Sequence, residues 1–533
     1  MGIAGALGEN DRETGIIEEI MLENRYQNPL RNWTQWQSVL YEKVRYEPAP
    51  QGGAITLLLN CTCNDLQMEG NRIKSVKGWQ LTTETWHTVE ATLFADCSGD
   101  SILAPLSGAE FRLGREARSE FGEAFGPETE PDQKTMGMSC LVGCRETDSP
   151  QPYIPPFWAN KYLSCDDLAH RRHNVFNINF WWIELGGEQD SIHDTEEIRD
   201  ELLKIAFGAW DHVKNHCDQK EENENWVLDW VGFLPGKRES RRYVGDYLMT
   251  QLDVSAEGRF DDLVGYGGWT MDDHPPGGFN WPGKPTVHHP APSPFGIPYR
   301  SLYSRNIENL VFAGRNISVT HAAMSATRVM ATCSIIGQAV GTAAAISLRD
   351  NLSPRDIYHQ RIEELKQTLM EDDCYLPWNT RQTPPLTQEG ELLASEGDPE
   401  PLRNGIDRPV DGQDNGWSGS PGSWVEYRFA SPRQVRNVRI IVDSELTRPW
   451  GDMGGYRPLK IEPWRVPETI LRAFRIEALD DNDDWQVIIR EKNNYQRLVR
   501  LETDVKTRAI RFVPEVTWGA GRVHLFAFDV DGD

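Results

Sequence analysis

The sequence lacks the cysteine pattern of a zinc-binding or disulfide-stapled protein. Its nine cysteines form no C-x-x-C pair and no Cys/His array with zinc spacing, so we predict no metal site. The two close pairs are Cys61-x-Cys63 and Cys140-x3-Cys144. We interpret the first pair as two small buried residues on one face of a strand. For the second pair, packing and a redox function are both open, and so is the redox compartment.

Positive charge is also scarce in this chain. Its 55 Lys and Arg residues stand against 81 Asp and Glu residues, which gives a net charge of −26 spread along the sequence. A field of this sign repels nucleic acid and anionic membranes, so we expect no nucleic-acid partner and no polyanionic substrate. The small-molecule substrate that we expect rests on the resemblance described below. The N-terminus has no signal-peptide pattern. Neither localisation nor oligomeric state follows from the sequence.

One long uncharged run stands out in the sequence. The longest uncharged run covers residues 329–348 and contains Gly337-x-x-x-Gly341, so a transmembrane helix and a buried core helix both need to be considered. The run holds many Thr, Ser, Ala and Gly residues rather than Leu and Phe. We therefore predict a buried core helix and no transmembrane segment.

The same region carries the pattern of a strand, a tight turn and a helix. Residues 309–313 are a short apolar run that ends on Gly314. Polar residues follow the glycine, and the uncharged helix comes after them. Such a turn directs backbone N–H groups and the positive end of a helix dipole toward an anion, for which a phosphate or a flavin carbonyl is suitable. An ordinary packing helix is the alternative on pattern alone.

Four segments resemble a known family, and one of them, ENDRETGIIEEIMLENRYQNPLRNWTQWQSVLYEKVR at 9–45, resembles the part that follows the first strand and helix of that family. The run IPYRSLYSRNIENLVFAGRNISVTHAAMSATRVMATCSIIGQAVGTAAA, residues 297–345, resembles the C-terminal flavin-contacting segment of the FAD-dependent oxidoreductases of the two-dinucleotide-binding-domain type. ADCSGD at 95–100 resembles their second glycine-acid signature, and PGKRESRRYVGDY at 235–247 is similar as well. The resemblance implies FAD as cofactor. The implied cofactor contacts are Ser98, Gly99, Asp100, Gly314, Arg315, Asn316, Ser325 and Arg328.

The resemblance also implies candidates for catalysis. It places His321 closest to the flavin, where an imidazole suits proton transfer, although a hydrogen bond within the turn is the alternative. Arg238 lies in a basic run with three open explanations. The run could bind a substrate carboxylate, contact the flavin or form salt bridges with the acidic surface. The expected reaction is hydride transfer from a C–H bond to flavin N5, with His321 or a second base taking a hydroxyl proton. We interpret His274, His288 and His289 as structural or surface residues.

One part of the family pattern is missing. A G-x-G-x-x-G turn after an opening strand holds the FAD pyrophosphate in such proteins. Gly2, Gly5 and Gly8 have the spacing G-x-x-G-x-x-G and no strand before them, so they fail this test. We hypothesise that the first strand and its turn are absent because the start is misassigned or truncated. A flavin-free carbohydrate-binding or scaffolding protein is therefore a second hypothesis.

The expected architecture is an α/β protein with a further all-β domain. We predict a three-layer Rossmann-like FAD/NAD(P)-binding core at 1–125 and 297–350, an inserted α+β substrate domain at 126–296, and a helix and linker at 351–400. Short alternating strands from residue 401 to 533 predict a jelly-roll sandwich. PVDGQDNGWSGSPGSWVEYRFASPRQVRNVRIIVD within it resembles galactose-binding-like, discoidin-type domains, and a carbohydrate-related substrate is a hypothesis on that basis.

Particular elements are expected within these domains. We predict strands at 55–60, 91–95, 135–144 and 174–184, an exposed hairpin at 74–90, and an amphipathic helix at 194–217 with a capping box from Asp194 and Glu197.

Overall fold

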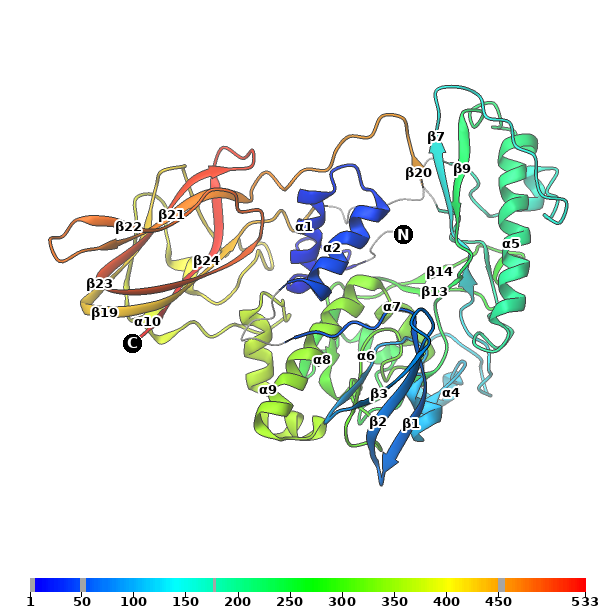
Figure 1. Cartoon of the computed structure of the whole chain (residues 1–533), viewed down its shortest axis with the longest axis horizontal. Helices are drawn as coiled ribbons and strands as arrows, with labels where there is room; N and C mark the ends of the chain where they lie inside the picture. Colours follow the sequence, from blue (N-terminus) through cyan, green and yellow to red (C-terminus); the bar gives the residue numbers. More distant parts are fainter. Residues whose placement is uncertain (1–4, 48–53, 176–178, 449–455) are drawn as a thin grey trace. The chain divides into compact units, whose positions relative to one another are not determined.

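A computed structural model describes residues 5–47, 54–175, 179–448 and 456–533 of the chain. The chain divides into two compact units (Figure 1). The first comprises Met1–Ala6, Leu58–Ile362 and Trp450–Glu462, and the second comprises Leu7–Leu57, Glu363–Pro449 and Pro463–Asp533. Residues 7–57 thus group with the C-terminal part of the chain, whereas the sequence assigns them to the cofactor-binding core. The domain boundaries proposed above remain predictions.

A pair of parallel strands lies at the centre of the first unit's candidate site. Strand β4 (Phe94–Asp96) pairs in parallel with β16 (Leu310–Phe312), with Asp96 opposite Phe312. Because parallel strands end at the same edge, the turns that follow them come together. The chain leaves β16 through α7 (His321–Thr327) and enters α8 (Met330–Asp350). The predicted order of strand, turn and helix is confirmed.

Helix α8 is long and apolar. It is long and hydrophobic enough to cross a membrane by length and composition alone, and 50% of its most apolar window is buried within the protein. Ile335, Ile336, Ala339 and Val340 are among its buried side chains. The core helices of soluble proteins pass the same test of length and composition.

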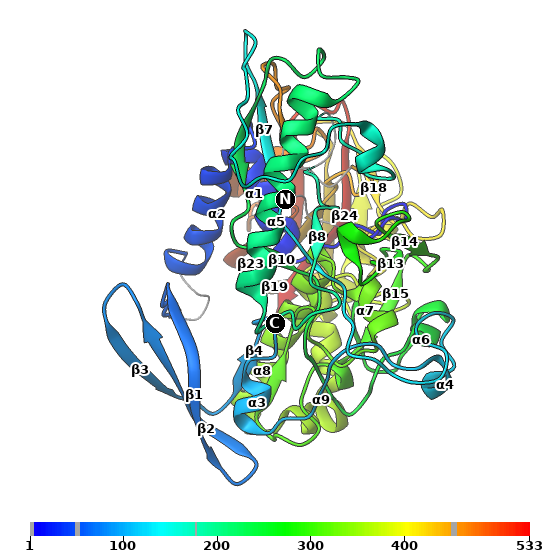
Figure 2. The same cartoon turned by 90° about the vertical axis from the view of Figure 1, so that its right-hand side faces the viewer.

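An antiparallel sheet of three strands precedes β4. Its order is β1 (Cys61–Glu69), β2 (Arg72–Gln80) and β3 (Thr85–Glu90), drawn in blue in Figure 2. This confirms the predicted hairpin. The predicted strand at 55–60 is wrong, because within the described residues no strand pairs with this run, and an apolar run without a partner cannot satisfy its backbone groups as a strand. Cys61 and Cys63 are half-buried rather than buried.

A helix and short strands form the region between β4 and β16. Helix α5 (Thr195–Asp211) continues as a π-helical turn, η3 (His212–His216), which confirms the predicted helix. Its predicted capping box is wrong, because the Asp194 side chain accepts a hydrogen bond from the backbone N–H of Asp190 instead of capping the helix. Residues 176–178 of the strand predicted at 174–184 lie outside the described residues, and of the described remainder only Glu184 belongs to a strand, β8 (Glu184–Leu185).

Short elements complete the first unit. The strand predicted at 135–144 is divided into β6 (Met138–Ser139) and β7 (Val142–Glu146), which join different sheets, β10-β6-β8 and β20-β7-β9. The other elements are α3 (Leu103–Ser107), β5 (Phe111–Arg112), α4 (Arg118–Phe121), η2 (Cys165–Leu168), β9 (Trp226–Val231), β10 (Gly236–Lys237), β11 (Arg242–Tyr243), α6 (Gln251–Ser255), β12 (Leu263–Gly267), β13 (Met271–Asp273), η4 (Gly278–Asn280), β14 (Val287–His289), β15 (Phe295–Pro298), η5 (Tyr299–Ser301) and β20 (Tyr456–Arg457).

The second unit is built on a β-sandwich. Seven strands pair in the order β18-β24-β19-β23-β21-β22, with β17 beside β19. The strands predicted at 424–429 and 435–442 are one long strand, because bulges between Arg428 and Asn437 absorb the polar segment between them. The elements of this unit are α1 (Ile16–Gln27), α2 (Trp33–Arg45), α10 (Pro385–Glu389), β17 (Glu391–Ala394), η6 (Glu400–Arg403), β18 (Trp417–Gly419), β19 (Val425–Val442), β21 (Leu471–Leu479), β22 (Trp485–Glu491), β23 (Leu498–Thr517) and β24 (Val523–Gly532), with α9 (Pro354–Glu371) leading into it.

The sandwich encloses an aromatic and aliphatic core. Tyr427, Phe512 and Phe528 are buried at its centre, with ring centroids 5.4 Å apart for Tyr427 and Phe528 and 5.9 Å apart for Phe512 and Phe528.

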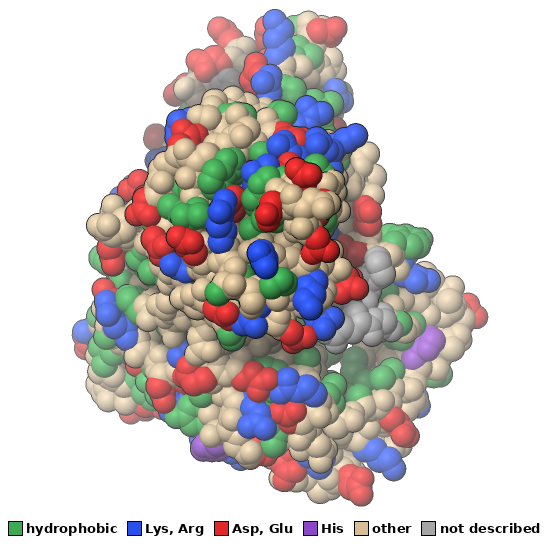
Figure 3. All heavy atoms as spheres, turned by 90° about the vertical axis from the view of Figure 1, so that its left-hand side faces the viewer, with side chains coloured by type: hydrophobic (Ala, Val, Ile, Leu, Met, Phe, Trp, Pro, Cys, Tyr) green, Lys and Arg blue, Asp and Glu red, His purple; other side chains and the backbone are tan. Residues whose placement is uncertain are grey.

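The outer surface is charged. Acidic and basic side chains are interspersed over the face drawn in Figure 3, as expected for acidity spread along the chain.

Candidate cofactor site

The turn after β4, residues 97–100, is held by a buried carboxylate. Asp96 accepts hydrogen bonds from the backbone N–H and the hydroxyl of Ser98, at 2.9 and 2.6 Å, and from the Tyr243 hydroxyl at 2.6 Å. The N–H of Leu103 also donates to it, at 3.0 Å. Ser98, predicted as a cofactor contact, thus has its hydroxyl engaged in shaping the turn.

Asp100 at the end of this turn meets Arg315 of the turn after β16. The Asp100 carboxylate lies 2.7 Å from the Arg315 guanidinium, 2.7 Å from the Ser240 hydroxyl and 3.2 Å from Lys237 Nζ. Burial alone would raise the pKa of Asp100, but Arg315, Ser240 and Lys237 together lower it. The structure therefore brings the predicted residues Asp100 and Arg315 together. It adds Lys237 and Ser240 from the basic run, whose roles the sequence left open.

The turns come close because both contain glycine in the left-handed region. Gly99 has φ +74° and Gly314 has φ +111°, conformations that L side chains rarely adopt. A Cβ atom at Gly99 would overlap the Arg315 guanidinium. The backbone of the first turn is thus free to approach the side chain of the second.

Unsatisfied polar atoms mark this junction. Asn316 donates from Nδ2 to the Asp96 carbonyl at 3.3 Å. Its Oδ1 and the Nε of Arg315 are buried and, among the described residues, have no hydrogen-bond partner. Buried polar atoms without partners are rare in folded proteins, and a ligand, an ion or a water molecule can complete them. A donor and an acceptor of this kind fit a polar, phosphate-bearing cofactor.

Ser325 and Arg328 lie on α7 and at its end. The Ser325 hydroxyl donates to the Ala322 carbonyl at 2.6 Å, so it is used inside the helix and does not join the Asp100–Arg315 pair. Arg328 donates to the Asp272 carbonyl at 3.0 Å and lies 3.4 Å from the Asp272 carboxylate. Burial lowers the pKa of Arg328, more than the Asp272 carboxylate offsets.

His321 begins α7 and is surrounded by carboxylates. Its Nδ1 lies 2.8 Å from Glu239, its Nε2 lies 3.3 Å from Asp273, and its backbone N–H donates to Glu116 at 2.8 Å. Burial alone would lower its pKa, but Glu239 and Asp273 raise it to about 10. His321 is therefore an imidazolium at neutral pH, a hydrogen-bond donor at both ring nitrogens. Its ring nitrogens contact Glu239 and Asp273, which lie outside the turn, so the alternative of a hydrogen bond within the turn is wrong.

Arg238 belongs to a second chain of charges. It lies 3.1 Å from the buried carboxylate of Glu184, which also lies 2.7 Å from His274. His274 in turn lies 3.3 Å from Asp272. The consecutive residues Asp272 and Asp273 of β13 thus link the chain of Arg238 to that of His321. Arg238 thus forms an ion pair with a buried carboxylate, not with the acidic surface, and its predicted catalytic role stays a prediction.

Sequence reasoning missed the acidic half of this network. Glu184, Glu239, Asp272 and Asp273 are the partners that fix Arg238 and His321. The local signals were the MDDH run at 271–274, an acidic pair beside a histidine that we interpreted as structural, and Glu239 within the basic run at 235–247.

Cys140 and Cys144 show no sign of redox function. Burial raises the pKa of each thiol to about 12, and the Cys140 thiol donates to the Gly232 carbonyl at 3.0 Å. A thiol of this kind is rarely ionised at neutral pH, and the thiolate is the reactive form. The geometry supports the packing interpretation.

The two turns and the helix after them have the arrangement of a dinucleotide-binding site. Glycine turns at the ends of two neighbouring parallel strands, followed by a buried helix, form the edge at which α/β proteins bind dinucleotides. The family comparison agrees: residues 3–369 match the model described as FAD dependent oxidoreductase, and the chain belongs to this family. Its core is accordingly Rossmann-like. A comparison with curated proteins found no match.

The sandwich resembles small carbohydrate-binding modules in its fold. One is the family 32 carbohydrate-binding module from Streptococcus pneumoniae EndoD, at 12% identity and a TM-score of 0.21, covering 27% of this chain and 98% of that chain. Another is the family 32 module from C. perfringens NanJ in complex with galactose, at 10% identity and a TM-score of 0.20, covering 28% and 97%.

Proposed function

We propose that the first unit binds FAD at the Asp100–Arg315 junction and oxidises a small hydroxylated, carbohydrate-related substrate. The observation that carries this proposal is the Asp100–Arg315 pair itself, with the partnerless Arg315 Nε and Asn316 Oδ1 beside it among the described residues. A phosphate-bearing ligand beside this ion pair would complete both atoms.

The residues that would hold FAD are those of the two turns. Gly99 and Gly314 let the backbone come close, Arg315 and Lys237 supply positive charge, and Asn316 supplies an amide oxygen. Bound FAD would supply the two-electron acceptor for the substrate hydride. The protein's part is to orient the substrate and to receive the proton of its hydroxyl.

His321 and Asp273 are the groups we assign to that proton. His321 is protonated at neutral pH, so it donates hydrogen bonds rather than removing a proton. Asp273, which lies 3.3 Å from it, is ionised because His321 and other nearby histidines lower its pKa against the effect of burial. Its carboxylate is 22% exposed, so a proton that it accepts has a route to solvent.

The surrounding network suits a hydroxylated substrate. Asp272 and Asp273 offer acceptors, and the Nε of Arg328, which has no hydrogen-bond partner among the described residues, offers a donor. Sugar hydroxyls pair with such alternating donors and acceptors. Arg238 acts on this proposal as a positioning residue, because it holds Glu184 and through it His274.

The test begins with the purified full chain. We expect a flavin absorption band, either as isolated or after addition of FAD. Anaerobic addition of a panel of sugars and sugar acids should then bleach the band with at least one of them. A colourless protein that takes up no FAD would refute the proposal and favour the flavin-free hypothesis. Flavin binding without bleaching by any hydroxylated compound would refute the substrate class alone.

A further inference from the structure

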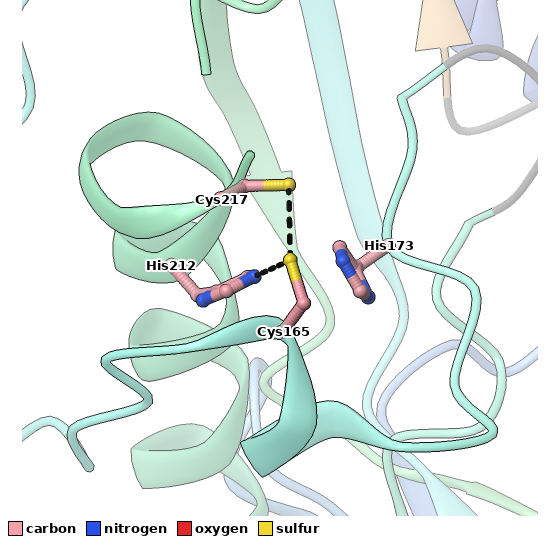
Figure 4. A group of neighbouring side chains, drawn as sticks. All are labelled: Cys165, His173, His212 and Cys217. Atoms are coloured by element: carbon pink, nitrogen blue, oxygen red, sulfur yellow. Dashed lines mark hydrogen bonds between the residues drawn. The ribbon is translucent and has the colours of Figure 1, made fainter. Parts of the chain in front are cut away.

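Four side chains from three separate segments of the first unit converge on one point (Figure 4). Cys165 begins η2, His212 begins the π-helical turn η3, and Cys217 directly follows that turn. His173 lies on the connection after η2. One ligand atom from each of the four residues lies within 4.8 Å of all the others. None of these residues belongs to the cofactor site.

The distances suit a tetrahedral metal ion. Cys165 Sγ lies 3.7 Å from His212 Nε2 and 4.0 Å from Cys217 Sγ. In a tetrahedral site with Zn–S bonds of about 2.3 Å and Zn–N bonds of about 2.0 Å, such atoms are about 3.5–3.8 Å apart. The two distances from Cys165 thus lie within a few tenths of an ångström of these separations, and all pairs of ligand atoms lie within 4.8 Å, so the side chains must draw closer together around an ion.

Hydrogen bonds prepare both histidines as ligands. His212 Nδ1 lies 3.0 Å from the Tyr162 carbonyl, and His173 Nδ1 lies 2.8 Å from the Arg171 carbonyl. A carbonyl oxygen only accepts, so the proton of each neutral ring sits on Nδ1 and the lone pair on Nε2. This is how metal-ligating histidines are commonly oriented.

The cysteines are prepared in a similar way. The Cys217 sulfur accepts a hydrogen bond from the Gln219 backbone N–H at 3.4 Å. His212 and Cys217 are buried, while Cys165 and His173 are half-buried, so an ion has a route in. The π-helical turn η3 brings the side chains of His212 and Cys217 close together. Such turns depart from regular helix geometry and often occur at functional sites.

We propose that Cys165, His173, His212 and Cys217 bind one Zn²⁺ ion. Two thiolates and two neutral imidazoles form a ligand set that zinc prefers, and the two thiolates neutralise the charge of the ion. Four protein ligands fill every tetrahedral position, so the site is structural rather than catalytic. It ties η2 and the connection after it to the end of α5.

The sequence conceals this site because its ligands are far apart. Their pattern is C-x7-H-x38-H-x4-C, and only His212-x4-Cys217 resembles the short spacing of known zinc motifs. The prediction of no metal site rested on spacing along the chain. The fold of the 165–217 segment supplies the proximity instead.

The test is metal analysis of the full chain, expressed with added zinc and purified under reducing conditions without chelator. We expect about one zinc per chain. After removal of zinc, Co²⁺ should give the visible bands of tetrahedral cobalt and a thiolate-to-cobalt charge-transfer band. No zinc in the folded protein, together with no cobalt bands, would overturn the proposal. So would a Cys165–Cys217 disulfide found by peptide mapping of protein purified without oxidant.

Variants separate the site from the remaining cysteines. Cys217→Ser should lose most of the zinc, whereas Cys63→Ser, half-buried on β1, should keep it. Because Cys217 is buried and its replacement risks misfolding, His173→Asn on the half-buried connection serves as a second variant. Far-ultraviolet circular dichroism checks that each variant is folded. Folded variants of both ligands with unchanged zinc content would show that the metal is bound elsewhere.

Discussion

Asp100 and Arg315 lie 215 positions apart in the sequence, yet their side chains are 2.7 Å apart. Each follows a strand of the parallel pair β4 and β16, so the pair holds the two turns of the cofactor site against each other. Ser240 and Lys237 complete the shell around the carboxylate. The geometry of the site therefore depends on an ion pair that is only partly exposed.

Removing this ion pair should weaken flavin binding. Arg315→Ala removes the guanidinium that we propose contacts the cofactor, and a hydrogen bond to a charged group contributes about 1.5–3 kcal/mol. We expect the Kd for FAD to rise about tenfold to a hundredfold, measured by flavin fluorescence titration. Asp100→Asn should have a smaller effect, because Arg315 remains but loses its anchor.

The matched control for this experiment is Arg145→Ala. Arg145 also forms an ion pair, with Asp229 at 3.4 Å, but it is half-exposed and lies away from the two turns. The Arg145→Ala protein should therefore have the same Kd for FAD as the unmodified protein. An Arg315→Ala protein with unchanged Kd would place the cofactor elsewhere.

Gly99 offers a test of the close approach between the turns. Gly99→Ala adds a Cβ that overlaps Arg315, and it also forces alanine into φ +74°. Gly108→Ala imposes the same backbone cost, since Gly108 has φ +75°, but no atom lies within 4 Å of its added Cβ. Both should lose about 1–2 kcal/mol of unfolding free energy.

Only Gly99→Ala should also raise the Kd for FAD, because only there is Arg315 displaced. Equal FAD affinity in the two variants would mean that Arg315 moves aside without consequence. The comparison thus separates strain from the loss of a cofactor contact.

His321 should make the stability of the first unit depend on pH. Its pKa is raised from about 6.5 in the unfolded chain to about 10 in the folded protein, so its contribution is fully present below about pH 6.5. That contribution, on the order of a few kcal/mol, is lost as the pH rises through 10. The unfolding free energy of the unmodified protein should therefore fall across this range.

In His321→Asn this part of the pH dependence should disappear. His193→Asn is the control, because His193 is exposed and pairs only with Asp190 on the surface. Denaturant unfolding at several pH values between 6.5 and 10 gives the comparison. If the unfolding free energy of His321→Asn depends on pH as steeply as that of the control, the imidazole is neutral in the folded state.

How far the sequence predicts the site depends on how local each feature is. The turn after β16 was predictable because Gly314 and the uncharged run beyond it lie within a few positions of the strand. The partners of His321 were not, since Glu239 and Asp273 come from other elements and their proximity arises only on folding. The zinc ligands were hidden for the same reason.

The fold followed the same rule. Alternation along the C-terminal strands predicted the sandwich, because each strand's pattern reflects its own burial. The strand expected at 55–60 failed, because a buried strand needs a partner that its own apolar residues cannot reveal.

The sandwich core supplies a prediction that is independent of the cofactor site. Phe528 is fully buried between Tyr427 and Phe512, and the Tyr427 hydroxyl donates to the Phe528 carbonyl at 3.0 Å. Phe528→Ala removes the ring and leaves a cavity, which typically costs about 3–5 kcal/mol. The unfolding free energy of the second unit, measured by tryptophan fluorescence in denaturant, should fall by that amount, and the transition should move to a lower denaturant concentration. Val487→Ala on β22 is the control, since Val487 is 47% exposed and should change stability by less than about 0.5 kcal/mol. Equal shifts in the two variants would mean that the aromatic core does not hold the sandwich together.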